Sequence, residues 1–163
     1  MSSDFYQASI LPYAGIIIKI CRAYTHNQAD FEDYYQEVCL QIWRSRDKFQ
    51  GKSNWSTWIY RLSLNVCLTL LKKDKKQPEL AATNTLEIIQ EHEPPAFSDE
   101  DLNQLYQAIR KLKEIDRAVI LLYLEEKSYQ EIAEIMGTNA NNVGVRIKRI
   151  KERLKKMLYG KVY

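Results

Sequence analysis

The C-terminal part of the chain carries a short helical pattern, a glycine and then a longer basic helical pattern. Ser128-Tyr129-Gln130-Glu131 is a capping box, and the helix that it opens is predicted to end at Gly137, which tolerates the positive φ of a sharp turn. A second helix, capped by Thr138 or Asn139, is predicted to run to about Tyr159. This combination is typical of a helix-turn-helix, which places its second helix in the major groove of DNA.

The second helix has an apolar face and a polar face. Its inward positions recur at spacings of four, three and four: Val143, Ile147, Ile150 and Leu154. Its outward positions near the amino end, which are expected to reach base edges, are Asn141, Asn142, Val145, Arg146, Lys148 and Arg149. Asn suits pairing with adenine, and Arg or Lys suits guanine. Gly144 either weakens this helix or permits close approach to DNA, and a helical hairpin with a solvated basic face is the alternative to DNA binding.

The elements that position these residues are predicted to be all-α. The 163 residues are 45% hydrophobic and 28% charged, with 5 Gly and 4 Pro, which favours a globular helical fold. We expect two small helical domains, residues 1–76 and 102–163, joined by a flexible acidic linker over residues 77–101. The linker has no Lys or Arg against 7 Asp and Glu, whereas the blocks before and after it carry net charges of +4 and +6. Basic blocks of this kind suit contact with phosphates.

Three helices are predicted in the first domain, over about residues 4–25, 28–46 and 53–73, with a loop before the third. The first is expected to bend at Pro12. Its expected buried positions are Ile10, Leu11, Ile17, Ile18 and Cys21. The expected core stripe of the third helix is Trp55, Trp58, Ile59, Leu62, Val66 and Leu70. In the second domain, a capping signal at residues 98–101 opens a helix to about Leu112, and another helix is predicted from Asp116 to Leu124.

Several classes of protein are disfavoured by the pattern of reactive residues. The cysteines Cys21, Cys39 and Cys67 are widely spaced and the two histidines are isolated, so we expect buried free thiols in a cytoplasmic protein, with no metal and no cofactor. The acids fall at helix starts and in the linker rather than in a catalytic cluster, so no enzyme activity is expected. No apolar stretch approaches the roughly 20 residues that a bilayer requires, so no membrane insertion is expected.

The C-terminal motifs resemble those of bacterial RNA polymerase sigma factors of the small extracytoplasmic-function (ECF) type. Residues 128–137 are similar to the first half of the family's promoter −35 reader, and residues 142–149 are similar to its recognition helix. The helix-turn-helix alone is shared by many transcription regulators. In this family it implies contacts to the −35 element by the outward set from Asn141 to Arg149.

The N-terminal motifs make the resemblance specific. Residues 31–38 followed by Ile42-Trp43 are similar to the helix with which sigma factors grip the polymerase clamp. Phe49-x-Gly51 followed by residues 55–65 is similar to the family's −10 element reader. Order, spacing and linker character agree over nearly the whole chain. Tyr34-Tyr35 stands where aliphatic residues are usual.

The resemblance implies a sigma factor that binds core RNA polymerase and directs initiation at promoter DNA, responsive to stress or another signal and controlled by an anti-sigma factor. The implied polymerase contacts are Glu32, Asp33, Gln36 and Glu37, acids that also suit a helix N-terminus. The implied −10 contacts are Lys52, Ser53, Asn54, Trp55, Arg61, Asn65, Lys72 and Lys73. Trp55 is equally suited to base stacking and to core packing, whereas Trp58 is more suited to core packing. Lys72 and Lys73 are suited either to phosphate contacts or to a solvated helix end.

The alternative function is a helix-turn-helix transcription regulator with an N-terminal dimerisation domain. Such a regulator has a self-complementary interface and palindromic DNA sites. A sigma factor is instead expected to be a monomer when free, to bind isolated duplex poorly, and to act only with core polymerase.

Overall fold

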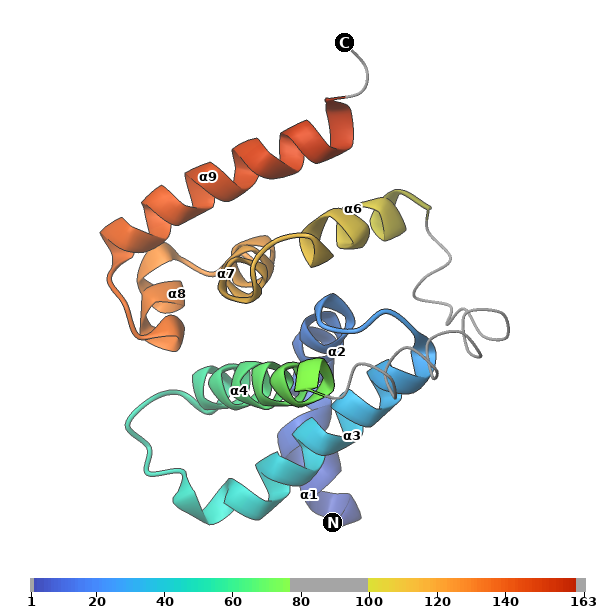
Figure 1. Cartoon of the computed structure of the whole chain (residues 1–163). Helices are drawn as coiled ribbons and strands as arrows, with labels where there is room; N and C mark the ends of the chain where they lie inside the picture. Colours follow the sequence, from blue (N-terminus) through green and yellow to red (C-terminus); the bar gives the residue numbers. More distant parts are fainter. Residues whose placement is uncertain (1, 77–99, 161–163) are drawn as a thin grey trace. The chain divides into compact units, whose positions relative to one another are not determined.

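Every regular element in the described part of the chain, residues 2–76 and 100–160 of a computed structural model, is a helix, and no strand forms there (Figure 1). The all-α prediction is therefore confirmed. The chain divides into two compact units, Met1–Glu93 and Pro94–Tyr163. The predicted linker over residues 77–101 falls almost wholly outside the described residues. None of the described helices has the length and apolar character needed to cross a membrane.

The first helical stretch changes its hydrogen-bonding geometry three times. It consists of α1 (Ser3–Phe5), a π-helical turn (Tyr6–Ile10), a 3-10 turn (Leu11–Tyr13) and α2 (Ala14–Ala23). The prediction was one helix that bends at Pro12; the structure instead divides this stretch into segments of different helical type, and Pro12, which has no amide hydrogen to donate, lies in the 3-10 turn. The irregular turns rotate the buried face, so Leu11 is 50% exposed and Ile18 is half-buried, contrary to prediction. Burial falls instead on Ile10, Ile16, Ile17, Ile20 and Cys21.

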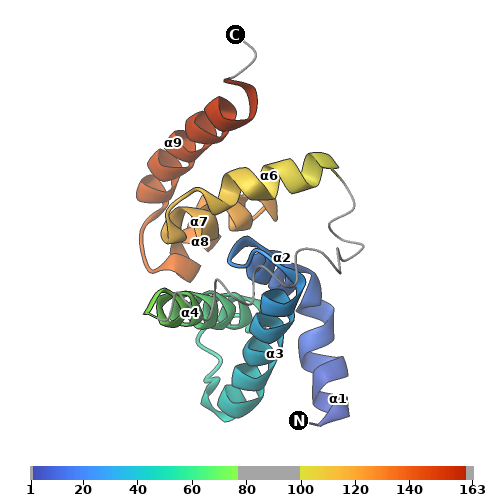
Figure 2. The same cartoon turned by 45° about the vertical axis from the view of Figure 1, so that its right-hand side comes forward.

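The helices α2, α3 (Gln28–Ser45) and α4 (Trp55–Lys76) pack on one another, and the N-terminal segment runs alongside α3 (Figure 2). Asn27 caps α3 by accepting a hydrogen bond from the Asp30 amide at 2.9 Å. The predicted core stripe of α4 was partly wrong: Ile59 is buried, but Leu62, Val66 and Leu70 are only half-buried. The buried face contains Ser63 and Cys67, because α4 packs against both α2 and α3. Ser63 is accommodated there by donating to the Ile59 carbonyl at 2.7 Å.

The three cysteines lie in the core of the N-terminal unit as free thiols, as predicted. The Sγ atoms of Cys21 and Cys67 are 3.9 Å apart. Burial raises the pKa of Cys39 to about 11, and the hydrogen bond with Cys21 raises the pKa of Cys67. Because the thiolate is the reactive form, Cys39 and Cys67 are structural rather than nucleophilic.

The C-terminal unit contains α6 (Glu100–Arg110), α7 (Glu114–Leu124), α8 (Tyr129–Met136) and α9 (Ala140–Tyr159), and α9 packs across the other three (Figures 1 and 2). The four inward residues of α9 are buried as predicted: Val143, Ile147, Ile150 and Leu154. Helix α7 begins two residues before the predicted Asp116. The predicted cap of α6 at Ser98 lies outside the described residues.

The start of α8 and the turn between α8 and α9 both have the predicted chemistry. Ser128 Oγ accepts from the Glu131 amide at 3.1 Å, while the Glu131 carboxylate accepts from the Ser128 amide at 3.0 Å. Gly137 ends α8 with a φ of +74°, and Asn139 caps α9. A Cβ on Gly144 would lie 3.2 Å from the Tyr129 ring, so this glycine allows α8 and α9 to pack closely.

Candidate nucleic-acid interface

The amino-terminal half of α9 presents the predicted reading side chains on its outer surface. Those of Asn141, Lys148 and Arg149 are exposed, and Val145 is 45% exposed. No carboxylate in the described part of the chain lies within ion-pair distance of Lys148 or Arg149. The burial of the opposite, apolar face fixes the direction of these side chains, because the helix cannot rotate without exposing its core residues. A preformed row of amides and cations results, with the composition that base edges and phosphates require.

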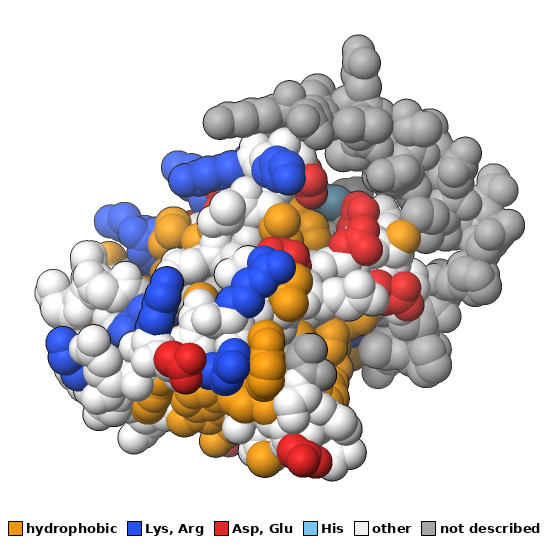
Figure 3. Space-filling model, turned by 90° about the horizontal axis from the view of Figure 1, so that it is seen from below, with side chains coloured by type: hydrophobic (Ala, Val, Ile, Leu, Met, Phe, Trp, Pro, Cys, Tyr) orange, Lys and Arg blue, Asp and Glu red, His pale blue; other side chains and the backbone are white. Residues whose placement is uncertain are grey.

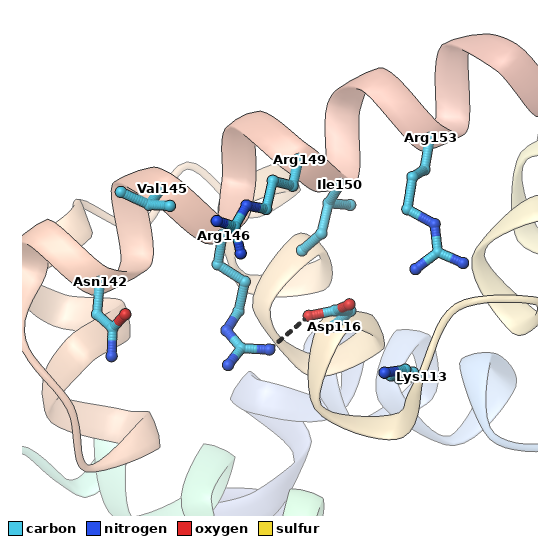
Figure 4. Close-up of a pocket in the computed structure, with 8 residues that line it drawn as sticks. All are labelled: Lys113, Asp116, Asn142, Val145, Arg146, Arg149, Ile150 and Arg153. Carbon is cyan, nitrogen blue, oxygen red and sulfur yellow. Dashed lines mark hydrogen bonds and ion pairs between the residues drawn. The ribbon is translucent and has the colours of Figure 1, made fainter.

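Arg146 behaves differently from its neighbours because it points toward α7 (Figure 4). Its Nη1 donates to Asp116 Oδ1 at 2.7 Å, and the side chains are 44% and 12% exposed, respectively. The ion pair lies in a pocket of about 270 Å³ whose charged lining also includes Lys113, Arg149 and Arg153. The sequence indicated Arg146 but not Asp116 or Lys113, because an acid in the first turn of a helix is already explained by the helix dipole.

Two further contacts organise α9. The Asn142 amide group donates to Thr138 Oγ1 at 3.0 Å while its backbone amide binds the Asn139 cap, so this predicted reader is exposed but oriented. Lys151 donates to the Tyr123 hydroxyl at 2.5 Å and lies 4.3 Å from the centre of that ring. The hydrogen bond raises the pKa of Lys151 and links α9 to α7.

In the N-terminal unit, the predicted −10 residues follow an aromatic cluster. The rings of Trp55 and Trp58 stack with centroids 4.9 Å apart, and Phe49 meets both edge-on at 5.1 and 5.7 Å. The Trp55 indole donates to the Ser9 carbonyl at 2.8 Å, and Phe5 packs edge-on against Trp55 and Trp43. Both Trp55 and Trp58 are half-buried. Packing therefore holds Trp55 in place and leaves part of its ring accessible.

The loop that precedes α4 contains three of the predicted −10 residues. Gly51 has a φ of +73°, which fixes the turn of the chain at that point. Lys52 and Asn54 are exposed, and Ser53 is half-buried with its hydroxyl 3.4 Å from the Asn54 carbonyl oxygen. These polar groups directly precede the stacked tryptophans along the chain.

The remaining predicted −10 residues lie along α4. Asn65, Lys72 and Lys73 are exposed, and Arg61 is half-buried with interactions of its own. The Tyr34 hydroxyl donates to Asp74 at 2.7 Å, which joins the lysine-rich end of α4 to α3. Burial raises the pKa of Tyr34, so it remains a donor over the physiological pH range. The aromatic residue noted at this position in the sequence thus has a specific partner.

The predicted polymerase contacts lie on α3, and three of them, Glu32, Asp33 and Gln36, are exposed. Glu37 is half-buried and accepts from Gln41 at 2.9 Å. A groove of about 300 Å³ is lined by Glu37 and Gln41 from α3 and by Asn65, Val66, Thr69 and Leu70 from α4. It brings one predicted polymerase contact and one predicted −10 contact together, which sequence spacing did not reveal.

Basic side chains are interspersed with uncharged and hydrophobic ones on the face drawn in Figure 3, rather than gathered into one block. Phosphate contacts must therefore be assigned to individual residues.

No group of three or more His, Cys, Asp or Glu within residues 2–76 and 100–160 is placed to hold a metal ion.

Comparison with known proteins assigns both units. The Sigma-70 region 2 family matches residues 10–77, and the Sigma-70, region 4 family matches residues 102–154. The chain is 30% identical over 158 residues to the ECF RNA polymerase sigma factor SigW of Bacillus subtilis, covering 90% of this chain and 84% of SigW. This chain belongs to the ECF sigma factors. It is thus a transcription initiation factor, and the prediction of a sigma factor is confirmed.

Other relatives agree with this assignment. The sigma factor is 27% identical over 161 residues to the RNA polymerase sigma-H factor of Pseudomonas aeruginosa, covering 91% of this chain and 83% of that protein. Its fold is similar to that of the sigma factor RpoE from Bartonella quintana, solved in complex with the anti-sigma factor NepR. That match has a TM-score of 0.72 and 21% identity, and covers 96% of this sigma factor and 98% of RpoE.

Proposed function

We propose that this sigma factor divides promoter recognition between its units. In this proposal α9 of the C-terminal unit reads the −35 element, and the loop before α4 together with α4 itself reads the −10 element. The acidic surface of α3 binds core RNA polymerase. The observation that carries the proposal is the exposed row of amides and cations on α9, which a capped helix-turn-helix holds in a fixed direction.

The −35 assignment is supported by the chemistry of α9. Its exposed side chains near the amino end include asparagines for adenine and Arg149 for guanine. The exposed lysine at position 148 is suited to a phosphate, which positions the protein without reading sequence.

The −10 assignment is supported by a combination of rigid and exposed groups. Opening DNA and capturing an extruded base costs a few kcal/mol, so the capturing site must offer stacking surface and polar groups without rearrangement. The stacked tryptophans 55 and 58 supply a rigid surface, and the exposed Lys52 and Asn54 supply polar groups beside it. Lys72 and Lys73 are suited to the phosphates of the same strand.

The polymerase assignment is supported by the exposure of Glu32, Asp33 and Gln36 on α3. The side chains of Asp33 and Gln36 bond to no other described residue, and the Glu32 carboxylate bonds only to the Gln28 side chain on its own helix. A partner surface that is basic would therefore find these groups available. Reversing the charge of Glu32 and Asp33 to Lys is expected to weaken binding to core polymerase without unfolding the unit.

The experiment is co-purification of the full chain with core RNA polymerase, followed by run-off transcription. The expected result is a stoichiometric complex that initiates at a defined promoter, and a Glu32→Lys, Asp33→Lys variant that does not form the complex. An Arg149→Ala variant is the matched control, because it should bind core normally. A chain that binds palindromic duplex as a dimer without polymerase would contradict the proposal.

We further propose that the chain acts in the cytoplasm as a monomer when free, and that an anti-sigma protein inhibits it. RpoE, which shares its fold, was solved in complex with an anti-sigma factor, and the exposed polymerase-binding surface offers such a protein a site to block. A pull-down from unstressed cells should recover a protein that prevents assembly with core polymerase. If no inhibitory protein is recovered, the result would count against regulation by an anti-sigma protein.

A further inference from the structure

The ion pair between α7 and α9 is a second layer behind the −35 reading surface. Asp116 is in the first turn of α7, and its residue surface is only 9% exposed. Its carboxylate receives the Arg146 guanidinium at 2.7 Å, and Figure 4 shows the arginine reaching from α9 to that carboxylate. A charged hydrogen bond of this length, with one partner largely buried, restricts the position of the arginine.

The contact with Asp116 orients the Arg146 guanidinium and leaves most of its N–H donors available. An arginine has five N–H donors in a planar fork, and one nitrogen, Nη1, is bound to Asp116. The side chain stays 44% exposed, so its other donors remain accessible. Arg146 lies four residues after Asn142 and three before Arg149, which places it on the same helical surface as two proposed readers.

Charge balance alone does not explain the acid. The pocket around the pair is lined by four cations, Lys113, Arg146, Arg149 and Arg153, against the single carboxylate of Asp116. The pocket therefore still favours an anion. A carboxylate beside a DNA-binding surface repels the phosphates of DNA. We therefore expect this electrostatic cost of Asp116 to be offset by a benefit, and the contact it makes is with Arg146.

We propose that Asp116 is a positioning residue that fixes Arg146 for reading a base pair of the −35 element, and so sets sequence discrimination rather than total affinity. Restricting a long side chain before binding removes the conformational entropy cost that a free arginine has on contact with DNA. It also limits the base edges that the fork can reach. The inference rests on the proposed −35 reading by α9.

The test uses the full chain assembled with core polymerase, with promoter templates that differ by single base pairs across the −35 element. Asp116→Asn keeps the shape of the side chain and removes its charge. Its expected effect is a loss of discrimination of about 5-fold at one base-pair position, the lower end of what one good base contact provides. Affinity for unrelated duplex should stay level or rise, because an acid has been removed.

Two further variants make the result specific. Arg146→Lys keeps the charge but loses the fork, so it should lose discrimination at the same position. In that background Asp116→Asn should have no further effect on discrimination. Glu152→Gln is the matched control, because it removes one exposed acid from α9 itself and should leave the preference unchanged.

Three outcomes overturn the inference. Asp116→Asn could discriminate at every position like the unaltered chain. It could raise affinity for all templates equally, which would make Arg146 a phosphate contact. It could lower the thermal midpoint of the C-terminal unit and weaken all templates alike, which would make the pair structural. If the unaltered chain shows no −35 preference, the proposed function fails, and the inference that rests on it fails as well.

Discussion

The two units hold their proposed DNA-binding side chains in opposite ways. In the C-terminal unit, one regular helix buries an apolar face and exposes a polar one, and hydrogen bonds within four residues cap it. In the N-terminal unit, the reading loop depends on distant residues, since the Trp55 indole binds the Ser9 carbonyl 46 residues earlier. A helix of the first kind is set by local sequence, whereas a loop of the second kind is set by tertiary packing. The predictions that follow test this difference, beginning with the largest expected effect.

Truncation of the aromatic cluster should have the largest effect. Trp55→Ala is expected to destabilise the N-terminal unit by about 3 kcal/mol, the lower end of the range for tryptophan truncation because the ring is half-buried. Chemical denaturation of the full chain should therefore show a less stable N-terminal unit and an unchanged C-terminal unit. Trp55→Phe is the matched control: it keeps a smaller aromatic ring and loses the bond to Ser9, and the loss of that bond costs about 1 kcal/mol. Equal destabilisation of both units would break the comparison.

Removal of a reading side chain from α9 should affect DNA and not stability. Arg149→Ala is expected to weaken −35 recognition by about 1–3 kcal/mol per lost base contact. Its exposed side chain makes no ion pair with the described residues, so the unfolding free energy and core binding should stay constant. Competition binding of the holoenzyme to matched and altered −35 elements measures this. An equal loss on every sequence would identify Arg149 as a phosphate contact.

The local cap should have a smaller effect, confined to the C-terminal unit. Ser128→Ala removes the acceptor of the Glu131 amide and should cost about 1 kcal/mol of unfolding free energy. The hydrogen bonds from Ser128 lower the pKa of Glu131 below its unfolded value. The stabilisation from ionised Glu131 is therefore full above the unfolded pKa and is lost as pH falls through the folded one.

Glu131→Gln isolates that titration, because the amide can still accept the bond but does not ionise. The stability difference between the unaltered chain and this variant should be constant near neutral pH and should diminish as pH falls through the folded pKa. A difference that is independent of pH in the acid range would contradict the capping account.

The smallest effect is expected at Gly144. Gly144→Ala gains helix propensity of up to about 1 kcal/mol but brings a Cβ to 3.2 Å from the Tyr129 ring. We expect the two contributions to offset each other. In a Tyr129→Ala background the contact is gone, so the same change should stabilise α9 by up to about 1 kcal/mol. Thermal unfolding of the four variants in the cycle measures the coupling, and its absence would exclude packing against Tyr129 as the reason for the glycine.

The same difference between local and distant support explains what the sequence could predict. The capping box, the Gly137 turn and the four inward positions of α9 were correct, because each depends on residues within one or two turns. The burial of Leu11 was wrong because the π and 3-10 turns around Pro12 change the helical phase. Contacts across the chain, such as Asp116 with Arg146 and Trp55 with Ser9, join residues that no periodicity relates.

The α4 core illustrates the same limit. Ser63 and Cys67 are buried because α4 packs between two helices, and a stripe drawn from hydrophobicity alone favoured Val66 and Leu70 instead. Those two half-buried residues line the groove with Glu37 and Asn65. The sequence therefore predicted interaction surfaces on α3 and α4, but not that two of their proposed contacts line one groove.

The most direct test of divided promoter recognition is run-off transcription by the reconstituted holoenzyme on a promoter library randomised over both elements, with the transcripts sequenced. The account predicts that the unaltered sigma factor selects two separate blocks of sequence. Arg149→Ala should relax only the upstream block, and Asn54→Ala only the downstream block. A variant in one unit that relaxes the block assigned to the other unit, or a library in which the unaltered chain selects one block, would contradict the account.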